Sequence, residues 1–156
     1  MSKEASSGLG SGVRSRFGPV SVPDGAAGVV RTAGGMNQVV LEFSGADINN
    51  DDFQKAVVPA GSLLVSAYAE IEEVFALGGT TPTIDIGTDG SEATNNVDIT
   101  EAQGEAVGTY DILGTPGGTW AAGLAADTTV SIALGGTTPT VTSAGKARVV
   151  LEFVKV

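Results

Sequence analysis

From residue 39 onward, short apolar segments alternate with turn residues, the pattern of an all-β domain. The domain opens on residues 39–43, VVLEF, and closes on the same five letters at residues 149–153. This identity predicts two equivalent strands that are neighbours in one sheet. Further strands are predicted at residues 83–87, 97–99, 107–113, 120–124, 128–134 and 140–142. Together they predict a jelly-roll-like antiparallel β-sandwich of about eight strands.

A longer repeat gives more detail. Residues 76–83, ALGGTTPT, recur unchanged at 133–140. The Gly pair permits positive φ and Pro favours extended backbone before it, so each copy predicts a strand, a tight turn and a second strand. Residues 63–75 fit either a helix or a strand, but the second copy follows the β-branched residues 128–132. By analogy 63–75 is interpreted as a strand. This strand would present one apolar face, made of Leu63, Val65, Ala67, Ala69, Ile71 and Phe75.

Two longer links, residues 44–58 and 88–96, are the places where a short helix or an interaction loop is expected.

The first 38 residues differ from the rest in composition and charge. They are rich in Gly, Ser and Ala, and they show no strand or helix period. They carry four basic and two acidic residues, net +2, whereas residues 39–156 carry four basic and sixteen acidic ones, net −12. We therefore divide the chain into an extended N-terminal arm, 1–38, and a sandwich domain, 39–156. The arm is expected to become ordered against a partner, and a disordered tail is the alternative.

Composition excludes several classes of function. The chain has no Cys and no His, which removes disulfides, thiolate nucleophiles, imidazole bases and the usual zinc ligands. A net charge of −10 argues against nucleic acid as a partner. No apolar stretch is long enough to span a membrane, and the first residues do not form a secretory signal. We expect a protein made in the cytoplasm, without a cofactor.

Acidic residues offer the nearest approach to a chemical site. Residues 85–92 place Asp at positions one and five and Gly at position six, as in a calcium loop, but the closing Glu of an EF-hand is missing. A turn closed by Asp side chains is the preferred interpretation. Asp47, Asp51 and Asp52 are expected to form a solvated acidic loop, with a bound hard cation as the alternative. The carboxylates at residues 70, 72 and 73 are expected on a charged outer face, and no catalytic residue is assigned.

Low aromatic content, 5%, limits the area that each strand buries and favours a homo-oligomer. The closing strand is apolar on both faces, so the predicted oligomer interface comprises Val150, Leu151, Phe153 and Val154. The single Trp, Trp120, is expected in the core or in an interface, with a carbohydrate-stacking platform as the alternative.

Three segments carry a resemblance to a known family. Residues 58–61 (VPAG) before a long apolar strand, 82–87 (PTIDIG) and 145–153 (GKARVVLEF) resemble small virion structural proteins of tailed bacteriophages. The chain is most similar to capsid decoration (cement) proteins over residues 57–156. The resemblance implies a sandwich subunit, commonly trimeric, that sits on the outside of the head and reinforces contacts between capsomers.

On this interpretation the partner is the major capsid protein, and the chain is a non-enzymatic component of the virion's outer surface. The arm would lie along the capsid, with basic side chains pairing with acidic groups and apolar ones filling shallow sites. The arm residues expected to do so are Arg14, Arg16, Phe17, Val20, Val22 and Arg31. The rival interpretation is a fibre or appendage module that binds carbohydrate or a host receptor near Trp120. An enzyme restricted to carboxylates is the third.

Overall fold

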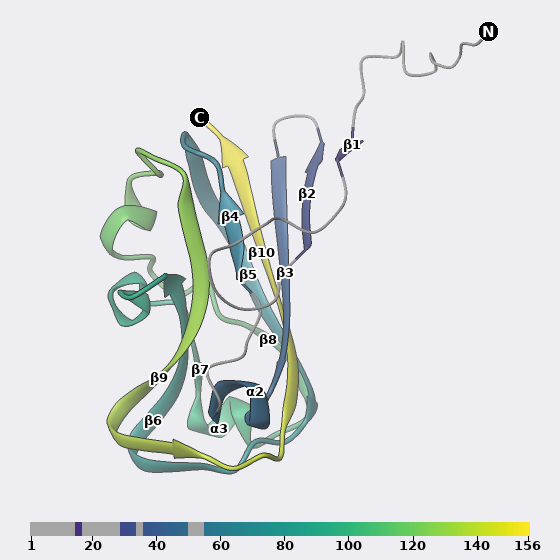
Figure 1. The fold of residues 1–156 in the computed structure, drawn as a ribbon, viewed down its shortest axis with the longest axis vertical. Helices are drawn as coiled ribbons and strands as arrows, with labels where there is room; N and C mark the ends of the chain where they lie inside the picture. The colour runs from purple at the N-terminus through teal and green to yellow at the C-terminus, as the bar shows by residue number, and fades with distance from the viewer. Residues whose placement is uncertain (1–14, 17–28, 34–35, 50–54) are drawn as a thin grey trace, which may run out of the picture.

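The computed structural model describes residues 15–16, 29–33, 36–49 and 55–156. Their strands form two sheets packed face to face (Figure 1). In spatial order, the first sheet consists of β1 (Ser15–Arg16), β2 (Val29–Ala33), β3 (Met36–Ser44), β10 (Lys146–Lys155), β5 (Ser62–Glu73) and β8 (Gly108–Asp111). The second consists of β4 (Ala56–Val58), β9 (Thr128–Val141), β6 (Leu77–Thr88) and β7 (Asp98–Thr100).

The strand order confirms a jelly-roll sandwich. Strands β3 to β10 divide into β3-β10-β5-β8 and β4-β9-β6-β7, so successive strands from β3 to β6 alternate between the sheets and β7 to β10 mirror them, as in a jelly roll. All pairings are antiparallel. β2 and β1 add to this eight-stranded core at the free edge of β3.

The two VVLEF segments pair with each other, as the sequence predicted. They lie in β3 and β10, centred on Val40 opposite Val150, with Leu41 opposite Val149. Alternation sends Leu41 and Val149 into the core, fully buried, and leaves Val40 on the outer face. β10 is thus a central strand between β3 and β5, and not an edge.

β5 confirms the strand interpretation of residues 63–75 but not the whole of its predicted apolar face. Ala67, Ala69 and Ile71 are buried as expected. Beyond them a register shift against β10 pairs Glu152 with Ser66 and Phe153 with Leu64, so Val65 is an extra residue in the strand. This bulge inverts the alternation. Leu64 is therefore the core residue, while Leu63 is only partly buried and Val65 is 41% exposed.

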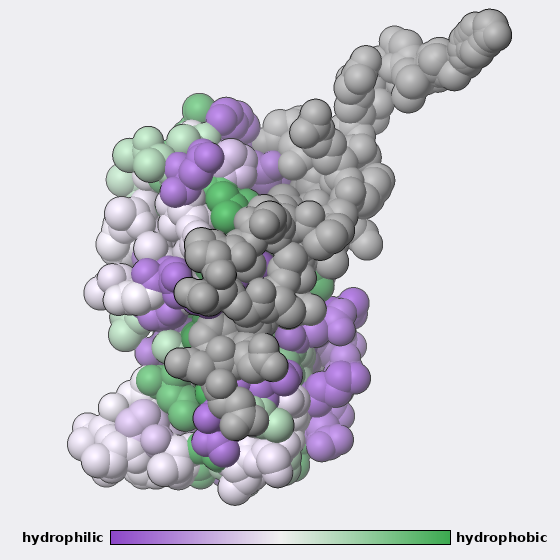
Figure 2. All heavy atoms as spheres, viewed as in Figure 1, coloured by the Kyte–Doolittle hydropathy of each residue, from purple (hydrophilic) through white to green (hydrophobic). Residues whose placement is uncertain are grey.

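The octapeptides do not make the predicted turns. Residues 77–83 of the first copy lie within β6 and the whole second copy lies within β9, and the two copies pair with each other. Register shifts at Gly78–Thr80 and Thr80–Thr83 bend both strands together, and Figure 1 shows them curving under the lower end of the molecule. This end is nearly white in Figure 2, because weakly polar Gly, Thr and Pro residues form it.

The links contain short helices, as expected: α2 (Gly45–Asn49) in the first and the 3-10 turn η1 (Glu92–Asn95) in the second. The first link also contains β4, which the sequence reasoning missed. The strand predicted at 120–124 is wrong, since residues Gly118–Ala121 form a second 3-10 turn, η2. Between β7 and β8, a capping box on Thr100 and Gln103 starts α3 (Glu101–Gly104).

Candidate functional site

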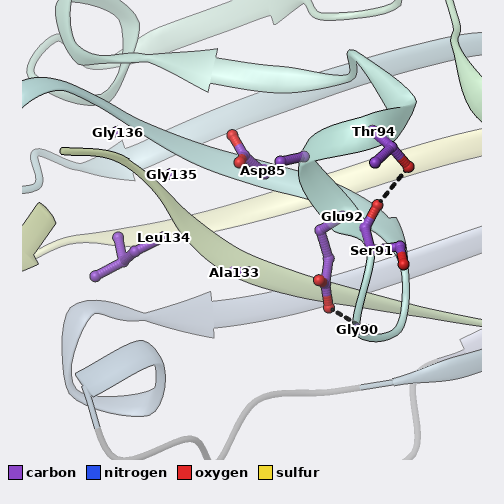
Figure 3. Close-up of a pocket in the computed structure, with 10 residues that line it drawn as sticks. Asp85, Gly90, Ser91, Glu92, Thr94, Ala133, Leu134, Gly135 and Gly136 are labelled. Carbon is purple, nitrogen blue, oxygen red and sulfur yellow. Dashed lines mark hydrogen bonds between the residues drawn. The ribbon is translucent and has the colours of Figure 1, made fainter.

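A shallow pocket of about 500 Å³ lies on the outer face of the four-stranded sheet. One wall is the segment from Gly90 to Thr94, which enters η1, and the floor is β9 at Ala133 and Gly135 (Figure 3). The segment lies close to the sheet because Gly87 of β6 has no side chain. A Cβ at Gly87 would come within 2.7 Å of the Glu92 Cα and carbonyl oxygen.

Two carboxyl groups face this pocket, and both are almost withdrawn from solvent. Asp85, on β6, is 7% exposed and Glu92, on η1, is 9% exposed. Asp85 Oδ1 accepts a hydrogen bond from Thr83 Oγ1 at 2.6 Å. Glu92 Oε1 accepts hydrogen bonds from Gly90 N at 3.1 Å and from Ser131 Oγ. Glu92 is thereby tied into the wall, whereas Asp85 Oδ2 accepts no hydrogen bond from the described residues.

A third carboxyl group, on Asp98, lies directly opposite Asp85 across the β6–β7 ladder. Directly paired residues of an antiparallel ladder share a face, so these two acidic side chains are neighbours. Burial raises the pKa of Asp98 above its ordinary value, and the charge of Asp85 raises this pKa further. Sequence reasoning missed Asp98, since nothing in the sequence pairs it with Asp85.

In the calcium-like loop, the side chain that closes on the backbone is Glu92 and not one of the Asp residues that the turn interpretation named. Asp89 pairs with Lys55 at 3.1 Å, and Glu92 binds the backbone of its own loop. Asp47 caps the start of α2 by accepting from Ser44 N at 2.7 Å, while Asp51 and Asp52 lie outside the described residues. Within the described ranges, no group of three or more acidic, His or Cys side chains is placed to hold a metal ion.

The outer face of the six-stranded sheet carries paired charges at one end. Arg148 Nη2 lies 2.6 Å from Glu70 Oε2, and Lys146 Nζ lies 3.0 Å from Glu72 Oε2. These contacts raise the pKa of both basic side chains. Hydrophilic atoms gather beside the lower end of β10 in Figure 2. The predicted charged outer face is therefore observed at residues 70 and 72.

The four residues predicted at an oligomer interface lie on two opposite faces of β10, because successive side chains of a strand point to opposite sides of the sheet. Leu151 and Phe153 are fully buried in the sandwich core, so their side chains are not available to a partner. Val150 and Val154 lie on the outer face, where Val150 is only 4% exposed, outside the core cluster, and Val154 is partly exposed. Only these two could contribute to an interface of folded subunits.

The predicted arm residues lie largely outside the described residues, among them Arg14, Phe17, Val20 and Val22. Arg16 lies in β1 opposite Thr32, and Arg31 lies in β2 opposite Gln38. These two positions therefore belong to strands added at the edge of the six-stranded sheet.

Trp120 is a core residue, as the preferred interpretation expected. Its side chain is 1% exposed, and its ring meets Phe153 edge to face at 5.6 Å. Nε1 donates a hydrogen bond to Thr88 Oγ1 at 3.1 Å. An indole so enclosed presents no face for a sugar, so the structure does not support the carbohydrate platform.

Among the described residues, no helix has the length and apolar character needed to cross a bilayer. No protein-family model, curated protein or solved structure matches the chain.

Proposed function

We propose that this chain is a non-enzymatic decoration protein of a tailed-phage head, which binds the outer capsid surface and stabilises contacts between capsomers. One observation carries most of the proposal. The jelly-roll core is complete in β3 to β10, and the N-terminal strands β1 and β2 are added outside it at one sheet edge. A body that closes its own core leaves the residues before β3 free for a second task.

The charge distribution along the chain supports the same distinction between a closed body and an N-terminal segment that binds a partner. Arg16 and Arg31 sit on the added strands, and residues 1–38 are net positive while residues 39–156 are strongly acidic. A basic segment on an acidic body is suited to binding an acidic protein surface. The ordering cost of such a segment is met on binding, and a repeated capsid lattice adds avidity.

A homotrimer would multiply that avidity, and the outer face of the six-stranded sheet offers an apolar row for subunit contacts. Val154 pairs with Met36 on one side and Leu63 on the other. Met36 is 43% exposed, and Val65, beside Leu63, is 41% exposed. Burial of this row in a trimer would remove apolar surface from water.

The direct test is the copy number of the chain in purified virions. Quantitative mass spectrometry should find the chain in a fixed ratio to the major capsid protein, and empty heads should bind the purified chain to saturation. Absence from virions, or unsaturable binding to heads, would overturn the proposal.

Charge reversal tests the role of the N-terminal residues without shortening the chain. A variant with Arg14, Arg16 and Arg31 changed to Glu should lose head binding about tenfold or more, and the loss should be largest at low salt. The matched control reverses Lys55, Lys146 and Lys155 on the body, which should bind nearly as the unaltered chain does. Equal binding by the arginine variant would count against the arm mechanism.

A further inference from the structure

The pocket between β9 and the wall at Gly90–Thr94 is shaped by backbone and by small residues. Its floor is made of Ala133, Gly135 and Gly136, whose side chains are small or absent. A Cβ at Gly135 would overlap Asp85 and come within 2.8 Å of its Cγ. The absence of a side chain at residue 135 is therefore what allows the Asp85 carboxyl group to lie over this floor, as Figure 3 shows.

Asp85 is the group that points to a ligand. It is more than nine-tenths buried, yet only its Oδ1 is hydrogen-bonded, to Thr83. Its Oδ2 lies over Gly135 and accepts nothing from the part of the chain that the structure describes. A buried carboxyl oxygen without a donor is costly, and here it also faces Asp98 on the next strand. The pocket therefore lacks a positively charged hydrogen-bond donor for Asp85 Oδ2.

The four basic side chains of residues 36–49 and 55–156 do not supply that donor, because each is engaged elsewhere. Lys55 pairs with Asp89, Lys146 with Glu72 and Arg148 with Glu70. Lys155 Nζ donates to the Ala60 carbonyl oxygen at 2.6 Å. The missing donor is therefore expected to come from another molecule or from outside these residues.

The donor geometry favours an organic cation over a metal ion. Calcium takes six to eight oxygen ligands in general, and the described carboxylates do not converge in a group of three. A guanidinium group needs fewer partners, because one carboxyl group can accept two of its planar N–H donors. The small residues of the floor leave room for such a flat group beside Asp85.

We propose that this pocket binds the guanidinium group of an arginine side chain from a second protein molecule, with Asp85 Oδ2 as the acceptor. The inference does not depend on the proposed function, since it rests on the body of the sandwich alone. The arginine could belong to a second copy of this chain, at residue 14, 16 or 31, or to a different protein.

The test is an NMR titration of the full chain with N-acetyl-arginine amide, compared with N-acetyl-citrulline amide, which has the same shape without the charge. The amide signals of Gly90, Ser91, Gly135 and Gly136 should shift with the arginine compound. Its apparent affinity should exceed that of the citrulline compound by about tenfold, the value of one charged hydrogen bond. Equal effects of the two compounds, or shifts elsewhere only, would overturn the proposal.

Three variants make the titration specific. Asp85→Asn should abolish the preference for arginine, whereas Glu152→Gln, the same change of charge on the other sheet, should leave it intact. Ala133→Leu should block the pocket without altering its charge. If Asp85→Asn fails to fold, loss of the preference for arginine in Ala133→Leu is the test of the site. Retention of the preference in Ala133→Leu would refute the assignment, and so would calcium shifting the same amides and displacing the arginine compound.

The source of the arginine follows from the same spectra. If it belongs to a second copy, the four amide signals should move as protein concentration rises, and this movement should be lost when Arg14, Arg16 and Arg31 are changed to Gln. Signals that respond to the arginine compound but not to protein concentration would support the site and assign its partner to a different protein.

Discussion

Gly79 and Gly136 occupy the same position in the two copies of one octapeptide, and each lies against the backbone of the other copy. A Cβ at Gly79 would come within 2.7 Å of the Thr138 carbonyl oxygen, and one at Gly136 within 2.6 Å of the Thr81 carbonyl oxygen. Their φ angles are +112° and +106°. The repeat is thus a pair of matched bends, related by an approximate twofold axis between β6 and β9.

Because the two bends are equivalent, the same substitution should lower the free energy of unfolding by a similar amount at both positions. Gly79→Ala and Gly136→Ala should each lower the free energy of unfolding by about 2–4 kcal/mol, because a methyl group meets both positive φ and close backbone. Gly90→Ala is the control: its φ is +80°, but nothing lies within 4 Å of the added Cβ, so only about 1–2 kcal/mol is expected. Urea denaturation measures all three, and clearly unequal costs at positions 79 and 136 would argue against equivalent bends.

Thr81 and Thr138 also occupy equivalent positions in the two octapeptides, but here the substitutions are expected to raise the free energy of unfolding. Both have φ of 48°, a region that β-branched residues disfavour and Asn tolerates. Thr81→Asn and Thr138→Asn should each raise the free energy of unfolding, by up to about 1 kcal/mol. A lowered melting temperature in both variants would mean that the Thr side chains stabilise the bend more than their backbone strains it.

Trp120 should behave as a structural residue. Trp120→Ala is expected to cost about 3–5 kcal/mol of folding free energy, through lost packing against Phe153. Thr88→Val removes the acceptor of the indole N–H and should cost about 1–3 kcal/mol. Thr109→Val on exposed β8 serves as the control and should be nearly neutral. Full stability of Trp120→Ala with loss of glycan binding would instead favour the carbohydrate module.

Asp98 predicts a pH dependence with a definite sign. Its pKa is raised above the ordinary 3.8 in the folded chain, so the folded state disfavours ionised Asp98. The resulting destabilisation is absent below the unfolded pKa and reaches its full value once the pH has risen through the folded pKa. Asp98→Asn should therefore be more stable than the unaltered chain at neutral pH. Thermal unfolding between about pH 3 and 7 measures this difference, and an equal difference throughout would contradict the assignment.

Leu151 and Val154 both lie on β10, but Leu151 is in the core and Val154 is on the outer face of the sheet. Leu151→Ala should cost about 2–5 kcal/mol at any protein concentration, because it leaves a cavity within a single subunit. Val154→Asp should instead reduce the oligomer mass measured by light scattering while the circular dichroism spectrum stays β-rich. An unchanged mass would remove the outer apolar row from the proposed trimer interface.

The sequence by itself determined the strand composition, the sandwich and the pairing of its two ends. Apolar alternation and turn residues encode the strands locally. The pairing of the two ends followed instead from the repeated VVLEF segments, which both occupy central positions in one sheet. The same period of two would have assigned Leu151 and Phe153 to the core, because they share the inward face with Val149.

The bulge, the paired bends and the acidic pocket depend on contacts between strands that are distant in the sequence, and only the tertiary structure decided them. The bulge at Val65 exists because β5 must match β10, and the octapeptides bend together because each supplies the surface against which the other lies. Asp85 and Asp98 become neighbours through the β6–β7 ladder, and a glycine fifty residues away from Asp85, Gly135, makes room for its carboxyl group. A local pattern fixes which face a side chain takes, whereas the acidic pocket is made by contacts that no local pattern contains.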